Sequence, residues 1–231
     1  MSTIKIERND CKYEITPLKE GASGLENEKI YKVIFIGDSG VGKTSLSIRA
    51  TKGLFNVSAQ ATIGFDIFNY AATINNEITI KLQIWDTCGL EEFNACTTSL
   101  YKDSSLAIIV YAINDIRSFN NVPNWVNLLK KHASPETIMF LVGNKSDLET
   151  TRKVAKEACE QTKRTYDFGF STETSAKDNK FVQELFTEGL IQLYELNKKY
   201  ENGMGEKREE LSKKNEHLNK TNNKKKKKNC C

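Results

Sequence analysis

One stretch of eight residues constrains this chain most: residues 37–44 run Gly-Asp-Ser-Gly-Val-Gly-Lys-Thr. The stretch matches the pattern G-x-x-x-x-G-K-[ST], a glycine-rich loop that wraps phosphate groups. The apolar run before it, residues 30–36, predicts a buried strand, and residues 45–50 predict the start of a helix. Glycine lets the backbone turn and approach a ligand with no Cβ in the way. The sequence therefore predicts a strand, a loop and a helix N-terminus that together bind phosphate.

Two side chains of this loop have distinct tasks. Lys43 can reach the terminal phosphates of a nucleotide, and the hydroxyl of Thr44 can ligate Mg²⁺. Asp86 stands at the end of another predicted strand, where a carboxylate that helps to hold Mg²⁺ belongs. The other loop residues expected to contact the nucleotide are Gly37, Asp38, Ser39, Gly40, Val41, Gly42 and Ser45.

The hydrophobic pattern predicts an α/β protein of the P-loop NTPase type. Runs at 30–36, 106–113 and 138–142 are apolar on both faces, as in parallel strands covered by helices. Residues 78–85 alternate apolar and polar after Asn75-Asn76, which predicts a hairpin whose second strand has one wet face. Helical periodicity appears at 119–129 and 182–193, and more weakly at 151–164. We expect a mostly parallel six-stranded sheet with one antiparallel strand, helices on both faces and a ligand at the carboxyl ends of the strands.

A second motif follows a buried strand and selects a base. Asp147, in the sequence Asn144-Lys145-Ser146-Asp147, can accept two hydrogen bonds from the N1–H and exocyclic amine of guanine. Adenine offers no matching pair of donors and would leave the carboxylate unpaired. An Asx turn would also explain this aspartate. The later loop Thr174–Lys177 can present a backbone N–H to the guanine oxygen, which strengthens the interpretation as a guanine site.

Charge divides the chain into two parts. From Asn197 onward 12 Lys and Arg stand against 5 Asp and Glu, so this tail carries +7 and the remainder −3 of the net +4. A mildly acidic body argues against nucleic-acid binding, and a basic tail favours an anionic surface. The six cysteines suggest neither a disulfide framework nor a zinc site, and the longest apolar run, eight residues, is too short to span a bilayer. We expect a flexible N-terminal extension at 1–28, a nucleotide-binding domain at 29–197 and a flexible tail at 198–231, with a short strand at Lys12–Ile15.

Five motifs occur in a fixed order: GDSGVGKTSL, TIGFD, KLQIWDTCGLEEF, VGNKSDL and ETSAK. This series resembles the Ras superfamily of small GTPases, and its Rab branch most closely. The resemblance covers residues 30–197 and the last two residues. It implies a GTP-binding switch that cycles between GDP and GTP forms, uses Mg²⁺, hydrolyses GTP and regulates intracellular vesicle trafficking.

The resemblance also implies roles for single residues. Thr62 is similar to the threonine that senses the γ-phosphate through Mg²⁺, which gives a metal set of Thr44, Thr62 and Asp86. Phe55 is similar to the aromatic residue that packs against guanine, and Gly89 to the glycine whose N–H meets the γ-phosphate beside the catalytic Lys43. The residues expected to hold the base are Asn144, Lys145 and Asp147, supported by Ser175, Ala176 and Lys177. Residues 53–65 and 87–101 resemble the two switches that bind effectors.

Leu90 departs from the family pattern, because Ras-type GTPases use a Gln there to orient the attacking water. Leucine has no donor or acceptor, so we predict slow intrinsic hydrolysis. A GTP-binding membrane adaptor that is deficient in hydrolysis therefore remains an alternative. A P-loop phosphotransferase is a third reading, but it would need an arginine-rich lid that this chain lacks, and it has no use for the Asp147 motif.

The chain ends with a lysine run at 224–228 followed by Cys230 and Cys231. Rab proteins that end in this way carry two geranylgeranyl groups, and two chains anchor stably where one would be marginal. Lysines add attraction to anionic lipid. We expect a monomer held by lipid on the cytoplasmic side of intracellular membranes, with a cytosolic pool. The implied partners are an exchange factor, a GTPase-activating protein, a GDP-dissociation inhibitor or escort protein, and effectors.

Overall fold

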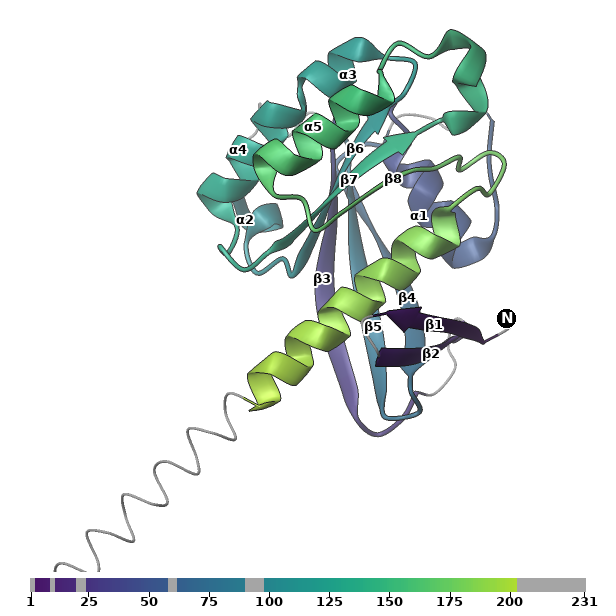
Figure 1. Ribbon diagram of the computed structural model, residues 1–231, viewed down its shortest axis with the longest axis vertical. Helices are drawn as coiled ribbons and strands as arrows, with labels where there is room; N and C mark the ends of the chain where they lie inside the picture. Colours follow the sequence, from purple (N-terminus) through teal and green to yellow (C-terminus); the bar gives the residue numbers. More distant parts are fainter. Residues whose placement is uncertain (1–2, 9–10, 20–23, 58–61, 90–97, 203–231) are drawn as a thin grey trace, which may run out of the picture. The chain divides into compact units, whose positions relative to one another are not determined.

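Eight strands form one sheet in the computed structural model, which describes residues 3–8, 11–19, 24–57, 62–89 and 98–202 (Figure 1). The strand order is β1-β2-β4-β5-β3-β6-β7-β8. The strands are β1 (Ile4–Arg8), β2 (Cys11–Pro17), β3 (Glu28–Ile36), β4 (Phe65–Ile74), β5 (Ile78–Thr87), β6 (Leu106–Ala112), β7 (Ile138–Asn144) and β8 (Phe170–Glu173). The labelled helices are α1 (Lys43–Lys52), α2 (Thr98–Tyr101), α3 (Ile116–Asn120), α4 (Val122–His132), the 3-10 helix η3 (Ser146–Thr151) and α5 (Lys156–Tyr166), and a further helix begins at residue 182.

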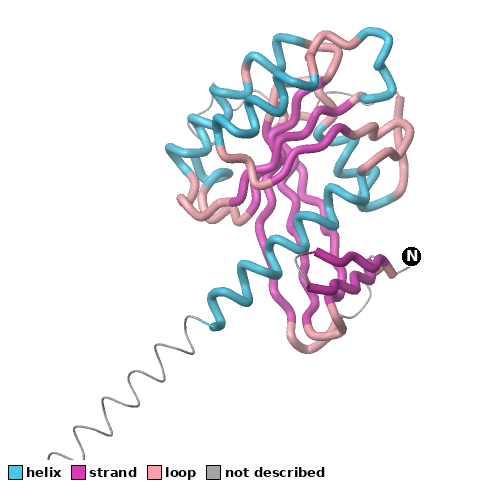
Figure 2. The backbone as a smooth tube through the Cα atoms, in the orientation of Figure 1, coloured by secondary structure: helices cyan, strands magenta, loops and turns pink. Residues whose placement is uncertain are grey.

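The centre of the sheet is parallel, as the apolar runs predict. β3 pairs in parallel with β5 on one side and with β6 on the other, and β7 and β8 continue outward from β6. Residues along the whole of β6 are buried, since helices cover both of its faces (Figure 2). The α/β fold with a mostly parallel sheet is therefore confirmed.

The predicted hairpin joins β4 and β5. Asn75 and Asn76 have left-handed φ values of 52° and 54°, and they are the two central residues of a turn in which Glu77 N donates a hydrogen bond to the carbonyl of Ile74 at 3.0 Å. β5 is antiparallel to β4 but also pairs with β3, so it lies inside the sheet and not at an edge. For this reason its polar positions are half-buried, or fully buried at Thr79, and do not form the wet face that the alternation predicts.

The predicted count of six strands is wrong, because the N-terminal segment adds a hairpin. β1 and β2 pair with each other, and β2 pairs with the end of β4 through Ile15 opposite Ile74. Tyr13 and Ile15 are buried, whereas Glu14 between them is exposed. Two strands of the sheet, β1 and β4, thus run opposite to the others. The predicted short strand at Lys12–Ile15 lies within β2.

Two layers of apolar side chains pack on the sheet. One cluster joins β3, β6 and β7 to α4 and α5, and its largest members include Trp125 and Tyr111. On β3, Phe35 belongs to a different group and stacks with Phe186 from the helix that begins at residue 182, with ring centroids 6.1 Å apart. The helical period at 119–129 becomes two helices, α3 and α4, which meet at Asn121 next to a proline in the first turn of α4.

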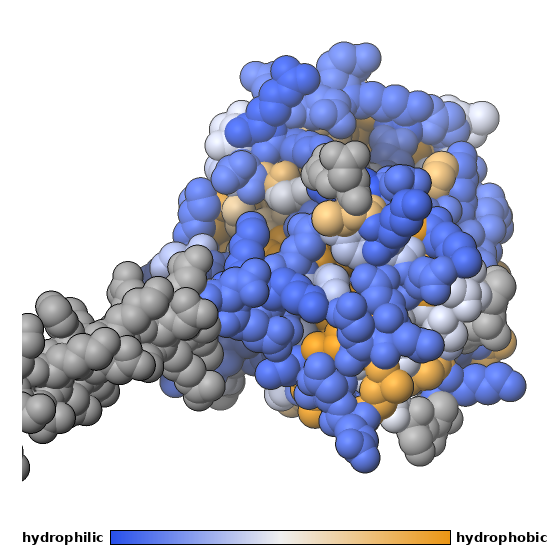
Figure 3. Space-filling view, turned by 60° about the horizontal axis from the view of Figure 1, so that its bottom comes forward, coloured by the Kyte–Doolittle hydropathy of each residue, from blue (hydrophilic) through white to orange (hydrophobic). Residues whose placement is uncertain are grey.

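The chain divides into two compact units, Met1–Ile191 and Gln192–Cys231. The first contains the sheet. In the second, residues 192–202 are helical, and Asn197 Nδ2 donates a hydrogen bond to Glu201 Oε1 at 3.0 Å, so helix continues past the predicted boundary at 197. Among the described residues, no helix combines the length and the apolar character that a bilayer crossing requires. The face of the molecule in Figure 3 is mostly hydrophilic, with small apolar areas between.

Candidate functional site

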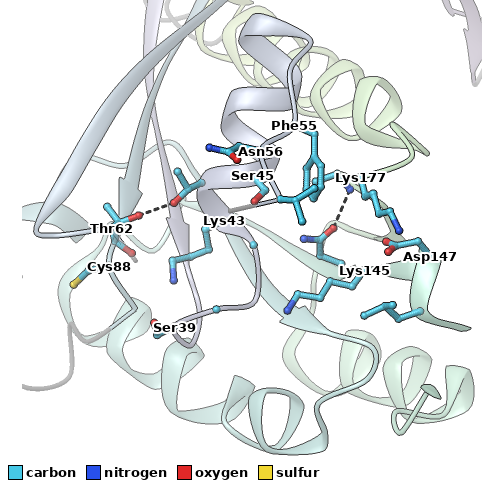
Figure 4. A pocket seen from close by; sticks show the side chains of 18 residues that line it. Ser39, Lys43, Ser45, Phe55, Asn56, Thr62, Cys88, Lys145, Asp147 and Lys177 are labelled. Carbon is cyan, nitrogen blue, oxygen red and sulfur yellow. Dashed lines mark hydrogen bonds between the residues drawn. The ribbon is translucent and has the colours of Figure 1, made fainter. Parts of the chain in front are cut away.

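A cavity of about 470 Å³ lies at the carboxyl ends of the parallel strands, within the size range of small-molecule sites (Figure 4). It is lined by residues from the loop after β3, the first turn of α1, the segment after α1, and the loops after β5, β7 and β8. The described residues that line it are Ser39, Gly40, Gly42, Lys43, Thr44, Ser45, Phe55, Asn56, Val57, Thr62, Thr87, Cys88, Asn144, Lys145, Asp147, Leu148, Ala176 and Lys177. Three of these are lysines and one is a carboxylate, so the lining attracts an anion.

The glycine-rich loop has the backbone that close approach requires. Gly42 has a φ of 98°, and a Cβ there would collide with Nδ2 of Asn144. Its carbonyl accepts the first helical hydrogen bond of α1, from Leu46 N at 3.0 Å. The loop therefore leads directly into the positive end of α1, an arrangement that binds phosphate.

Lys43 is 4% exposed and spans the loop from inside. Its Nζ donates hydrogen bonds to the carbonyls of Gly37 at 2.6 Å and Asp38 at 3.1 Å. Gly89 packs against the same place: a Cβ on it would stand 2.7 Å from Lys43 Nζ and 2.5 Å from the backbone nitrogen of Ser39. With a φ of 82°, Gly89 brings only backbone to this face of the loop.

The oxygens predicted to hold Mg²⁺ come from three elements. The hydroxyls of Thr44 and Thr62 lie 2.7 Å apart (Figure 4). Asp86 is fully buried near the end of β5, opposite Phe35 in the β3 ladder and so next to the start of the loop. Two hydroxyls and one carboxylate are hard oxygen donors of the kind that Mg²⁺ takes together with phosphate oxygens and water. No cluster of three or more His, Cys, Asp or Glu that could hold a metal ion occurs among the described residues.

The base-binding motif is braced by hydrogen bonds. Ser175 Oγ donates to Asp147 Oδ1 at 2.7 Å and so orients that carboxylate. Asn144 is 2% exposed; its Nδ2 donates to the carbonyl of Val41 at 2.9 Å, and its Oδ1 accepts from Ala176 N at 3.3 Å. Asn144 thus ties the phosphate loop to the 175–177 loop, which fixes the distance between the two ends of the cavity.

Phe55 and Lys145 approach the cavity from opposite sides (Figure 4). Lys145 has a φ of 67°, a left-handed conformation that turns the chain between β7 and η3. An aromatic ring facing the stem of a lysine makes a slot for a flat, apolar ring, with Asp147 at its edge. A purine base has that shape.

The structure brings most of the sequence-predicted site residues to the cavity lining. Six of the described site residues are not part of the lining: Gly37, Val41, Gly89 and Ser175 support it as described, Asp86 is buried near the end of β5, and the side chain of Asp38 points elsewhere. The Asp38 carboxylate accepts hydrogen bonds from Asn121 Nδ2 at 2.7 Å and Trp125 Nε1 at 2.8 Å. Leu90, Cys230 and Cys231 lie outside the described residues.

Sequence reasoning missed several lining residues. Cys88 and Thr87 were assigned only to a switch segment, and Leu148 directly follows the Asp147 motif, so its position next to that motif was the available signal. Arg49, Asn121 and Trp125 do not line the cavity but hold its walls. No local pattern singles them out, because each acts across more than 80 residues of sequence.

Comparison with known proteins identifies the family of this chain. The sequence model of the Ras family matches residues 32–195. The chain is 42% identical over 160 residues to the Ras-related protein Rab-13 of Bos taurus, covering 69% of this chain and 78% of that protein. It is 39% identical over 169 residues to the Ras-related protein SEC4 of Candida albicans, covering 73% and 80%. It is 41% identical over 157 residues to the Ras-related protein Rab-30 of Homo sapiens, covering 68% and 76%.

Membership of this family supports guanine-nucleotide binding, hydrolysis of GTP to GDP and phosphate, and a role in vesicle trafficking. The chain belongs to the Ras family and, within that superfamily, to the Rab small GTPases.

Proposed function

We propose that this protein is a Mg²⁺-dependent guanine-nucleotide switch whose intrinsic hydrolysis is slow and which works on a membrane through a lipid-modified C-terminus. The observation that carries the proposal is a single cavity with the phosphate loop at one end and the oriented Asp147 carboxylate at the other. Lys43 and the N-terminus of α1 would bind the phosphates. Thr44, Thr62 and Asp86 would hold Mg²⁺, which supplies positive charge beside the terminal phosphates when bound.

Nucleotide competition tests the base assignment. We expect GTP and GDP to displace a fluorescent GDP analogue at concentrations at least ~10³-fold lower than ATP or ADP, because a mismatched base leaves the Asp147 carboxylate unpaired. Asp147→Asn exchanges an acceptor pair for a donor and an acceptor, so its preference should move toward xanthine nucleotides. Equal displacement by ATP and GTP would refute the guanine site.

Leu90 supports the slow hydrolysis. Leucine cannot orient the attacking water, and we expect single-turnover hydrolysis below the ~10⁻⁴ s⁻¹ scale of Ras, with a faster rate for Leu90→Gln. Activating proteins of the Rab class supply both an Arg and a Gln, so a partner can restore the rate. Equal rates for the two chains, at the speed of an ordinary small GTPase, would exclude Leu90 as the cause. If no partner restores turnover, the membrane adaptor becomes the better description.

The tail supports a membrane role. Cys230 and Cys231 would carry geranylgeranyl groups, and the five lysines at 224–228 would add ~1 kcal/mol each of attraction to an anionic surface. Replacing both cysteines with serine should move the protein to the soluble fraction of fractionated cells. Retention in the membrane fraction would show that another group provides the anchor.

An apolar surface next to the cavity supports effector binding. Ile63, Phe65 and Ile67 are 97%, 47% and 43% exposed, and Phe65 stacks on Trp85 with ring centroids 5.1 Å apart. The Nζ of Lys32 lies 4.6 Å from the ring centroid of Trp85. The resemblance to Rab proteins places an effector-facing aromatic cluster at Ile67, Trp85 and Leu100, of which only Trp85 is aromatic. Phe65, two positions before Ile67 on the same face of β4, supplies a second ring, so effectors would meet an aromatic pair in this region.

A further inference from the structure

Arg49 lies on α1, and all three nitrogens of its guanidinium donate hydrogen bonds to backbone carbonyls next to the cavity. Its Nε donates to the carbonyl of Ala176 at 2.7 Å, its Nη2 to the carbonyl of Lys177 at 2.9 Å, and its Nη1 to the carbonyl of Gly53 at 2.6 Å. All three acceptors are backbone oxygens. Ala176 and Lys177 are more than 120 residues away in the sequence, so this contact joins α1 to the last loop of the site.

The three acceptors belong to the two loops that flank the base slot. Ala176 and Lys177 line the cavity from the loop after β8, and Gly53 begins the segment that carries Phe55. The guanidinium carbon of Arg49 also lies 5.9 Å from the centroid of the Phe55 ring. Arg49 itself does not line the cavity, so it acts on a ligand only through these neighbours.

The two loops differ in their other support. The 175–177 loop is also held by Ser175 on Asp147, by Ala176 on Asn144 and by the bridge between Ser175 and Lys180. Gly53 ends α1 in the left-handed conformation, with a φ of 68°, so its carbonyl points out of the helical ladder and accepts from Arg49 instead. The segment after it is exposed at Leu54 and Val57. Arg49 therefore ties the segment that carries Phe55 to the well-supported 175–177 loop.

We propose that Arg49 is a positioning residue that holds the base slot closed from behind and thereby sets the rate at which guanine nucleotide leaves. This inference rests on the proposed guanine site. A planar fork with fixed donor directions can reach three carbonyls at once, whereas the single ammonium of lysine cannot match that geometry. Arg49→Lys keeps the charge and loses the fork, so it isolates the feature that the inference depends on.

The test measures nucleotide release and chemistry separately in the full-length protein. A fluorescent GDP analogue is loaded and chased with excess GDP, and single-turnover hydrolysis is followed with preloaded GTP. For Arg49→Lys we expect release to accelerate about tenfold, which corresponds to ~1.4 kcal/mol. Hydrolysis of bound GTP should slow by much less than that factor, since the fork braces the base and not the phosphates. Arg49→Met should accelerate release further.

Controls separate this role from general damage. Arg117→Lys makes the same exchange at a side chain that is 90% exposed on α3, and its release rate should match that of the native chain. Equal release from the native chain and both Arg49 variants would overturn the inference, and so would hydrolysis that falls as much as release rises. If Arg49→Met does not fold, Arg49→Lys decides alone. A native chain that does not retain the GDP analogue would instead overturn the proposed guanine site itself.

Discussion

The Asp38 carboxylate should stabilise the protein more than an ordinary loop aspartate, because it accepts two hydrogen bonds from the α3–α4 junction. Its Oδ1 is 2.7 Å from Asn121 Nδ2 and 2.8 Å from Trp125 Nε1. Hydrogen bonds to a charged group contribute ~1.5–3 kcal/mol each, and a buried donor left unpaired costs ~1–3 kcal/mol. Trp125 is 1% exposed, so water cannot replace the lost acceptor. We expect Asp38→Ala to lower the free energy of unfolding by about 2–4 kcal/mol.

Urea denaturation followed by circular dichroism measures this loss at one fixed GDP concentration, since bound nucleotide itself adds stability. Asp38→Asn keeps one acceptor oxygen and should lose about half as much. Asp66→Asn, at an exposed carboxylate on β4, is the matched control and should stay within ~0.5 kcal/mol of the native chain. A double-mutant cycle with Trp125→Phe should give a coupling of about 1–2 kcal/mol. Losses that add within ~0.3 kcal/mol would refute the contact as the source.

Three further substitutions test the packing. Ile15→Ala in β2 removes a fully buried side chain and should cost about 2–4 kcal/mol in urea denaturation, whereas Lys12→Ala on the exposed side of the same strand should cost less than ~0.5. Gly143→Ala places a Cβ 2.6 Å from the hydroxyl of Tyr111 and should cost about 1–3 kcal/mol; Tyr111→Phe in the same chain should recover part of the loss, and no recovery would exclude that hydroxyl as the obstacle. Burial raises the pKa of Tyr70 from 10 to about 12, so the folded state keeps this proton longer than the unfolded chain. The resulting stability is present below pH 10 and disappears as the pH rises to 12, by ~3 kcal/mol relative to Tyr70→Phe. Parallel loss in the two chains over that range would contradict the assignment.

The sequence predicted the parts of the fold that depend on local pattern. Continuous apolar runs became β3, β6 and β7, and the Asn75-Asn76 pair became the turn of the β4–β5 hairpin, because side-chain burial and backbone conformation are written in neighbouring residues. The N-terminal hairpin was only partly visible. Its second strand alternates buried Tyr13 and Ile15 with exposed residues, whereas its first strand, IKIER, has only five residues, none of them fully buried, which is a short signal of alternation.

For the site, too, the sequence predicted the features that depend on neighbouring residues. Motif residues are recognised by their type at a fixed spacing, and most of them line the cavity. Asp38 lies inside a motif, yet its carboxylate is directed toward Trp125, because an apolar helix face with one indole N–H needs an acceptor there. A motif specifies where the backbone goes. The direction of a side chain that does not touch ligand depends on which helix packs behind the loop.

By the same reasoning, relatives that share these motifs need not share the same rate of nucleotide release. The motifs fix the contacts to phosphate and base, and these are short-range. The stiffness of the slot depends instead on long-range braces such as Arg49 to Ala176 and Asn144 to Val41, whose donors and acceptors come from different elements. In these two braces the acceptor is a backbone carbonyl, so the accepting position can change its side chain without losing the hydrogen bond. Only the donor is constrained in type. Variation in release among chains of this kind should therefore follow the identity of the donors at positions such as Arg49 more closely than that of the residues they touch.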